Sequence, residues 1–161
     1  KTLFPYTTLF RSLGANPTPL PFPEVYGALE QKAIDGQENP YTVIHANKLY
    51  EVQKYLAITN HQYNPQSVII SKKFWDRLSA DEKKILQDAA VESAKYQRVV
   101  SRKEMAVALE GLKKAGMEVT EFSPAEIAKF TEKMKPVYDK HAAALGGTYK
   151  ELAEELAKLR K

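Results

Sequence analysis

The sequence predicts a helix-rich α/β protein with a few short strands. Apolar residues recur at helical spacing along residues 81–115, which indicates one long helix. Two Ser-x-x-Glu motifs, "SADE" from Ser79 and "SPAE" from Ser123, are typical of helix N-termini. Three short runs, "LAITNH", "SVIIS" and the alternating "MEVTEF", are β-branched or apolar and predict strands.

The first half of the chain divides into short elements. The run "NPTPLPFP" should be extended, because proline fixes φ and removes a backbone donor. A short helix is expected over 23–34, then a loop, "DGQENP", in which Pro40 restricts Asn39 to an extended conformation. A second helix is expected over 41–55, and strands over 56–61 and 67–71.

The second half is dominated by the long helix, expected over 81–115. At 1.5 Å per residue it reaches roughly 50 Å, which exceeds a small domain, so it should bend or cross between two lobes. Gly116 is the expected C-terminal cap, and a strand over 117–122 follows. The next helix begins at Pro124, and Pro136 should kink or end it. A terminal helix is expected after "GGTYKE".

The first twelve residues, "KTLFPYTTLFRS", show neither a helical period nor a clean alternation. They resemble the translated adapter sequence often seen at the ends of metagenomic reads. We therefore expect residues 1–12 to be non-native and the native domain to occupy 13–161. The alternative is a short native strand.

Composition excludes several classes of protein. The 161 residues suffice for one domain with a real core, and 43% hydrophobic with 27% charged residues is an ordinary soluble composition. No apolar run approaches a membrane span, and no signal peptide is visible. The sequence has no cysteine, which fits a cytosolic protein and a disulfide-free periplasmic protein equally. The net charge of +4 is interspersed with acids, so no nucleic-acid surface is predicted.

Enzyme motifs are nearly absent. The sequence lacks GxSxG, HExxH, P-loop and GxGxxG patterns, and none of its three histidines has a second ligand at metal spacing. Asp35 and Glu38 could form an acid pair, but two acids beside a turn are more often a cap and a solvated side chain.

Small-molecule binding has more support. Polar and aromatic side chains come from loops at predicted strand ends, where open α/β sheets bind ligands. The candidate ligand-binding residues are Phe22, Gln37, Glu38, Asn39, His61 and Tyr63. Purely structural roles remain open for each: Phe22 in the core, Asn39 as a turn or cap, and His61 as a loop histidine with satisfied hydrogen bonds.

A resemblance adds to this interpretation. The pieces "GANPTPLPF", "DGQENP", "YEVQKYL", "TNH" and "SKKFWD", in this order, resemble the DctP-type solute-binding protein of tripartite ATP-independent periplasmic (TRAP) transporters. The resemblance runs from about Leu13 to the C-terminus. It implies the C-terminal part of a two-lobed, venus-flytrap fold with a long helix spanning both lobes, and most of the N-terminal lobe absent.

The resemblance also implies roles for individual residues. Asn39 of "QENP" would contact the ligand, Phe22 would wall the pocket, and His61 of "TNH" would support the site. The family's carboxylate-binding arginine lies upstream of "LGANPTP", so Arg11 is not assigned that role. In a keto-acid branch the position matching Glu38 can hold a metal ion, but this sequence departs from that branch's pattern and no metal is predicted.

The expected function is therefore capture of a small organic acid (a dicarboxylate, keto acid or sugar acid) in the periplasm and delivery to TRAP membrane subunits. No reaction, cofactor, nucleic-acid partner or membrane insertion is expected. Two alternatives remain: a helical protein-interaction module built on the 81–115 stripe, and an enzyme of unknown type using Asp35, Glu38 or His61.

Overall fold

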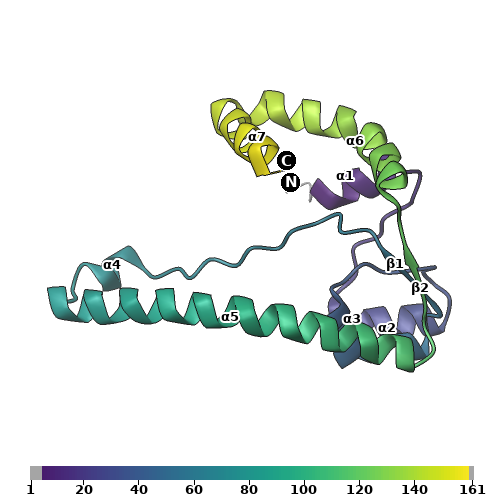
Figure 1. The fold of residues 1–161 in the computed structure, drawn as a ribbon, viewed down its shortest axis with the longest axis horizontal. Coiled ribbons are helices and arrows are strands. Elements are labelled where there is room, and N and C mark those ends of the chain that lie inside the picture. The colour runs from purple at the N-terminus through teal and green to yellow at the C-terminus, as the bar shows by residue number, and fades with distance from the viewer. Residues whose placement is uncertain (1–4, 160–161) are drawn as a thin grey trace. The chain divides into compact units, whose positions relative to one another are not determined.

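The computed structural model describes residues 5–159, and the protein forms two compact units. Unit 1 combines Lys1–Phe22 with Glu121–Lys161, and unit 2 is Pro23–Thr120. Figure 1 shows the elements of both units along the sequence. Each unit is described by itself below.

Unit 2 begins with three short helical elements that supply half of its buried apolar residues, and Leu56, Met117 and two residues of the long helix supply the others. These are α2 (Phe22–Glu30, whose first residue belongs to unit 1), α3 (Tyr41–Ala46) and the 3-10 helix η1 (Leu49–Glu51). Their apolar residues are buried because each short element packs only one face inward. The buried side chains are Val25, Leu29, Ile44 and Leu49, and those of Ala108 and Leu112 join them from the long helix.

The predicted long helix is confirmed as α5 (Ala80–Lys114). It starts at the predicted capping box: the Ser79 hydroxyl accepts the Glu82 backbone N–H, while the Glu82 carboxylate accepts the Ser79 backbone N–H at 2.8 Å. The Glu82 carboxylate also accepts the Ser79 hydroxyl at 2.8 Å, and the two bonds that Ser79 donates to this carboxylate hold the pKa of Glu82 below its usual value. Gly116 has a φ of +93°, the left-handed conformation expected after a helix C-terminus.

Only the C-terminal part of α5 is packed, because α3 lies against it there. The apolar residues that recur at helical spacing along α5 form the predicted stripe, and most of them are exposed. Ile85 is 65%, Tyr96 72% and Val107 54% accessible. The stripe therefore forms as a helix face, but residues 5–159 leave most of it uncovered.

Two strands, β1 (Tyr55–Ile58) and β2 (Glu118–Glu121), pair in a two-stranded sheet. The Glu118 backbone N–H donates to the Lys54 carbonyl at 2.9 Å, and the Lys54 ammonium lies 2.7 Å from the Glu118 carboxylate. The strand predicted over 117–122 is thus confirmed at its centre, whereas the strand predicted over 56–61 is confirmed only over residues 56–58 and ends before Thr59.

Two predictions in unit 2 were wrong. The helix expected over 41–55 breaks after α3, since Lys48 adopts a left-handed φ of +54° and the chain re-forms only as η1. The strand expected over 67–71 is not formed, because within the described residues no backbone hydrogen bond links 67–70 to another segment. A four-residue helix, α4 (Lys72–Trp75), follows it.

Unit 1 contains α1 (Pro5–Ser12), α6 (Pro124–Leu145) and α7 (Gly147–Leu159), with α1 packed against α6. The expectation that the opening segment is not helical was therefore wrong for residues 5–12. These residues form one short helix, which buries Thr7, although the helical period of their apolar side chains is weak.

α6 begins at the predicted Ser123–Glu126 capping box, with Pro124 at its first turn. Pro136 does not end it, and α6 changes direction along its length in Figure 1. None of the helices within residues 5–159 combines the length and apolar character needed to cross a membrane.

Candidate functional site

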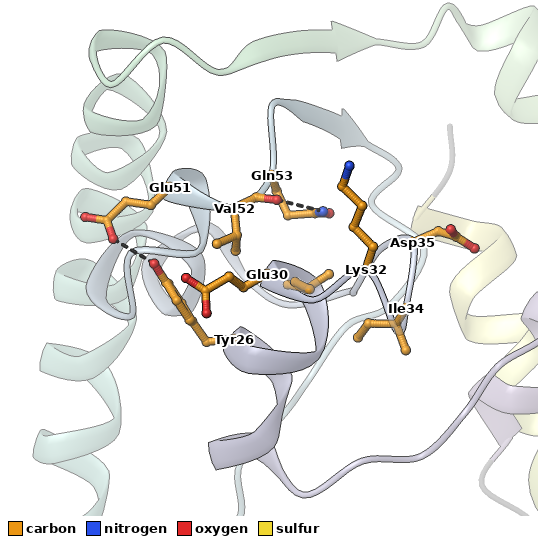
Figure 2. A pocket seen from close by; sticks show the side chains of 9 residues that line it. Tyr26, Glu30, Lys32, Ile34, Asp35, Glu51, Val52 and Gln53 are labelled. Carbon is orange, nitrogen blue, oxygen red and sulfur yellow. Dashed lines mark hydrogen bonds between the residues drawn. The ribbon is translucent and has the colours of Figure 1, made fainter.

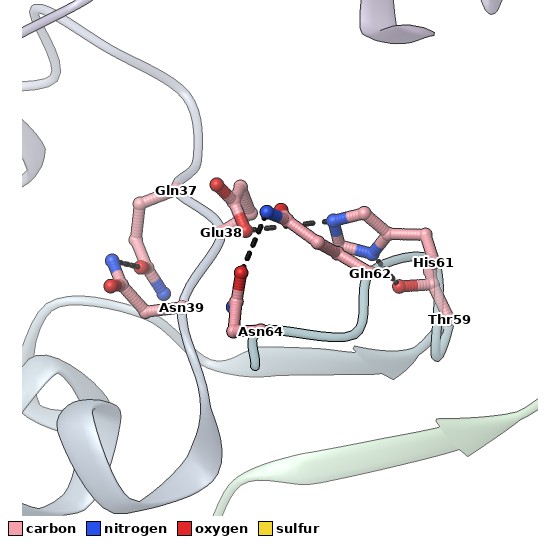
Figure 3. Close-up of polar contacts among 7 residues, drawn as sticks. All are labelled: Gln37, Glu38, Asn39, Thr59, His61, Gln62 and Asn64. Carbon is pink, nitrogen blue, oxygen red and sulfur yellow. Dashed lines mark hydrogen bonds and ion pairs between the residues drawn. The ribbon is translucent and has the colours of Figure 1, made fainter. Parts of the chain in front are cut away.

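The loop before α3 carries three of the predicted site residues. Asn39 immediately precedes Pro40, whose extended backbone (φ −60°, ψ 151°) caps α3. The Asn39 side-chain amide donates to the Gln37 side-chain oxygen at 2.7 Å, and both residues are half-buried. Figure 3 shows the two amides facing each other across the bend of the loop. This bond fixes the orientation of the Asn39 amide.

The end of β1 carries a second polar group that reaches the same loop. The Thr59 hydroxyl lies 2.5 Å from His61 Nδ1. On the other side of the ring, His61 Nε2 lies 3.5 Å from the Glu38 carboxylate, within ion-pair distance when the ring is protonated (Figure 3). The side chain of His61 is only 21% exposed and that of Glu38 is 39% exposed. His61 therefore links the β1 end to the loop that carries Asn39.

Two predicted residues are exposed and are not among the residues that form the hydrogen bonds and ion pair of this cluster. Tyr63 follows β1 but is 87% exposed. Its neighbours Gln62 and Asn64 bond to each other at 2.7 Å. Phe22 is the last residue of unit 1 and is 44% exposed, so its role as a pocket wall stays a prediction.

A hollow of about 550 Å³ lies elsewhere in unit 2, and the sequence did not reveal it. Figure 2 shows side chains from α2, from the loop after it, and from the end of η1 around it. The lining residues are Tyr26, Leu29, Glu30, Lys32, Ile34, Asp35, Glu51, Val52 and Gln53. Of the acids weighed from sequence only Asp35 lines it, and none of the six predicted ligand-binding residues does.

The chemistry of this hollow does not suit an anionic ligand. It presents the carboxylates of Glu30, Asp35 and Glu51 against one lysine, Lys32. The Tyr26 hydroxyl donates to Glu51 at 3.0 Å, and this hydrogen bond raises the pKa of Tyr26. Sequence reasoning missed Glu51 as a neighbour of Tyr26 because it predicted one continuous helix where the chain turns into η1.

Metal ligation finds no support in the described part of the chain, where no three His, Asp or Glu side chains gather as a metal site would require. The polar groups that do converge are amides, a carboxylate, a hydroxyl and an imidazole. Such groups bind and orient a polar molecule by hydrogen bonds.

The described residues place polar loop side chains beside the end of β1 in a helix-rich α/β unit. The family model for the bacterial extracellular solute-binding proteins, family 7 (DctP), matches residues 6–145. This chain belongs to that family.

Relatives agree with the assignment. The C4-dicarboxylate-binding periplasmic protein DctP of Rhodobacter capsulatus is 39% identical over 84% of this chain and 41% of its own length. A TRAP periplasmic solute-binding protein from Ochrobactrum anthropi, with its C-terminus bound in its ligand-binding pocket, is 52% identical with a TM-score of 0.90. The match covers 96% of this chain and 49% of that one.

A third relative is a sugar-acid-binding protein from Advenella mimigardefordensis, solved in complex with galactonate. It is 42% identical, with a TM-score of 0.83, over 96% of this chain and 50% of that one. The sequence thus spans about half the length of these two solved proteins. These matches confirm the predicted fold class, a portion of a two-lobed periplasmic binding protein.

The family match begins at residue 6, earlier than the predicted start near Leu13. The expectation that residues 1–12 are non-native is not tested by this overlap and stays a prediction.

Proposed function

We propose that this polypeptide supplies one wall of the ligand site in the solute-binding subunit of a TRAP transporter. The subunit captures a small organic acid in the periplasm and delivers it to the membrane subunits. Binding, not turnover, is the proposed activity. The observation that carries the proposal is the linked cluster of Gln37, Asn39, Glu38 and His61 in a member of the DctP family.

Asn39 is the proposed ligand contact. Its amide uses one N–H to bond Gln37, so the other N–H and the carbonyl are available to a ligand. Because Gln37 and Pro40 fix the amide before a ligand arrives, little side-chain entropy is lost on binding. A pre-oriented amide suits one oxygen of a carboxylate and a neighbouring hydroxyl.

Glu38 and His61 are proposed to support the site, with His61 holding the loop by its contacts to Glu38 and Thr59. Phe22 is proposed as an apolar wall and Tyr63 as a contact at the rim. A carboxylate ligand also needs a cation, and an arginine outside this polypeptide is the proposed partner because its planar fork binds carboxylates bidentately.

The ligand class follows from the relatives. One of them binds a C4-dicarboxylate and one holds galactonate, and both of these ligands carry a carboxylate. The Ochrobactrum protein holds its own C-terminus, and the last residue of a polypeptide also carries a carboxylate. A dicarboxylate, a keto acid or a sugar acid therefore fits the proposed site.

The test is a thermal-shift experiment on a single polypeptide that joins this protein to the half of the Ochrobactrum anthropi protein that it does not match. This polypeptide is called the hybrid below. The ligand panel is succinate, a 2-oxo acid and galactonate, with galactose as the matched neutral control. A bound acid raises the melting temperature because it stabilises only the folded state.

Asn39→Ala should weaken binding by about 10- to 100-fold, as expected for a lost hydrogen bond to a charged group. Gln87→Ala removes an exposed amide on α5 and should leave the affinity unchanged. A ligand whose shift survives Asn39→Ala intact would contradict the site. Equal shifts from galactonate and galactose would contradict the carboxylate class.

A further inference from the structure

The chain that leaves β1 bends so that Thr59 meets the ring of His61. Asn60, which lies between them, has a φ of +44°, a left-handed conformation that asparagine tolerates better than most residues. The strand therefore ends in a tight bend, and the Thr59 hydroxyl lies 2.5 Å from His61 Nδ1. Thr59 was not among the site residues predicted from the sequence.

A threonine hydroxyl suits this place because it can both donate and accept a hydrogen bond. When the ring is neutral, the hydroxyl can donate to Nδ1, which leaves the ring proton on Nε2. When the ring is protonated, the hydroxyl accepts from Nδ1–H, and Nε2 again carries a proton. In both states an N–H faces the Glu38 carboxylate, and the ring keeps its orientation (Figure 3).

The charge of the ring is what changes between these two states. Histidine ordinarily gains its charge between about pH 8 and pH 5. His61 Nε2 lies 3.5 Å from the Glu38 carboxylate, and the His61 side chain is only 21% exposed. Glu38 is the titratable side chain recorded against the ring, whereas the other side chains in Figure 3 are amides and one hydroxyl, which carry no charge. Protonation therefore turns this contact into an ion pair.

Glu38 stands directly beside Asn39, the proposed ligand contact. A carboxylate at Glu38 without a counter-charge opposes a carboxylate ligand, because like charges repel. A protonated His61 offsets that charge and holds more firmly the loop that carries the Asn39 amide. Both effects favour an acidic ligand when the ring is charged.

We propose that Thr59 is a positioning residue for the ligand site and that it makes the affinity for an organic acid rise as the pH falls. Thr59 holds the His61 ring toward Glu38, and the proton that the ring takes from solvent tightens the loop of Asn39. The affinity change rests on the proposed function, whereas the tightening of the loop needs no ligand. The two parts can therefore be measured separately.

The first measurement is the affinity of the hybrid for galactonate, by titration calorimetry at about pH 8 and about pH 5.5. Galactonate suits this range because an ordinary carboxyl group titrates near pH 4 and so stays ionised. The affinity should rise by about two- to fivefold on acidification, as expected for a partly exposed ion pair.

Thr59→Val keeps the shape of the side chain but removes the hydroxyl, so it should abolish this rise. Thr59→Ser restores a hydroxyl and should restore the rise. The matched control is Thr131→Val on α6, which removes a hydroxyl that donates to the Ile127 carbonyl at 3.0 Å. This control should keep the full pH dependence, which a merely structural role of Thr59 would not alter.

The second measurement is hydrogen exchange in this protein without ligand. The Val43 and Ile44 amides donate to the Pro40 carbonyl at the end of the loop. Their protection factors, which are corrected for the intrinsic pH dependence of exchange, should rise by about two- to fivefold between the same two pH values, and not in Thr59→Val. The Ala115 amide, which donates to the Gly111 carbonyl, is the internal control and should not show this rise.

Each outcome bears on one part of the proposal. An affinity for galactonate that does not change with pH, or a rise that survives Thr59→Val, overturns it and leaves the site at Asn39 standing. An equal rise in protection at Ala115 also overturns it, because pH then acts on the stability of the whole unit. If no acid stabilises the hybrid at either pH, the proposed function fails, and exchange at Val43 and Ile44 alone decides whether Thr59 positions the loop.

Discussion

The ring of His45 on α3 fills the space into which a side chain at Gly111 on α5 would project. A β-carbon at residue 111 would lie 2.5 Å from His45 Nε2 and 2.9 Å from Cδ2. The two helices approach this closely because Gly111 has no side chain. The contact lies beside the buried Ile44 and Leu112, in the only part of α5 that is packed within the described residues.

Gly111→Ala should therefore destabilise unit 2 despite the higher helix propensity of alanine. The His45 ring must move, and we expect a loss of about 1–2 kcal/mol, at the lower end for overpacking because the ring can rotate outward. The measurement is the midpoint of urea unfolding. In a His45→Ala background the same change should become neutral or stabilising, by up to about 1 kcal/mol.

Gly27→Ala supplies the control for this experiment. Gly27 lies inside α2, and a β-carbon there meets nothing within 4 Å. This substitution should stabilise the protein by about 0.5–1 kcal/mol, since alanine is the better helix former. A destabilising effect of Gly111→Ala that persisted without the His45 ring would disprove the proposed cause.

The capping box of α5 predicts a pH dependence. The pKa of Glu82 is lowered in the folded protein by its bonds from Ser79. The folded state therefore binds this proton less readily than the unfolded state does. The ionised Glu82 carboxylate therefore stabilises the folded protein at pH values above its ordinary pKa of about 4.5. This stabilisation is lost as the pH falls through the lower pKa of the folded state.

Glu82→Gln should remove that part of the acid sensitivity, and Ser79→Ala should cost about 0.5–2 kcal/mol at neutral pH. Both are measured by urea unfolding between neutral and acid pH. Gln87→Ala, which removes no titratable group from α5, is the control and should leave the acid slope unchanged. An acid slope that Glu82→Gln failed to flatten would mean that the capping box is not its source.

Local signals in the sequence predicted the elements that depend on local chemistry. Both capping boxes and the long helix formed as expected, because the bonds that define a helix start lie within four residues of one another. The helix expected over 41–55 ends before Lys48, whose left-handed backbone breaks it, and Leu49 is buried in the separate 3-10 helix η1.

The missing strand over 67–71 has a different cause. Its β-branched residues were identified correctly, but a strand exists only with a partner, and residues 5–159 provide none. The candidate site also combines a local feature with a long-range one. The loop that holds Gln37 and Asn39 could be predicted from "QENP". The contact between Glu38 and His61 could not, because these residues are far apart in the sequence and only the folded chain brings them together.

His61 should help to hold Asn39 in position through its contact with the neighbouring residue Glu38. His61→Ala removes the link between the end of β1 and the loop, so the Val43 and Ile44 amides, which donate to the Pro40 carbonyl at the end of this loop, should exchange roughly fivefold faster, equivalent to about 1 kcal/mol. Hydrogen exchange in the absence of ligand measures the effect. His141→Ala, on α6, is the matched control and should not change the exchange of this loop. If His61→Ala left the loop as protected as before, His61 would not be a positioning residue.

The pair between Lys54 and Glu118 tests what joins the two strands. Its atoms are 2.7 Å apart, but the side chains are 63% and 59% exposed, so water and salt screen the attraction. Lys54→Met and Glu118→Gln should each cost little, and the double-mutant cycle should give a coupling energy of about 0.2–1 kcal/mol that falls at high salt. The backbone bond from Glu118 to Lys54 remains in both variants, so the sheet should persist. A coupling energy well above this range, insensitive to salt, would show that the pair is desolvated in solution and holds the sheet more strongly than its exposure implies.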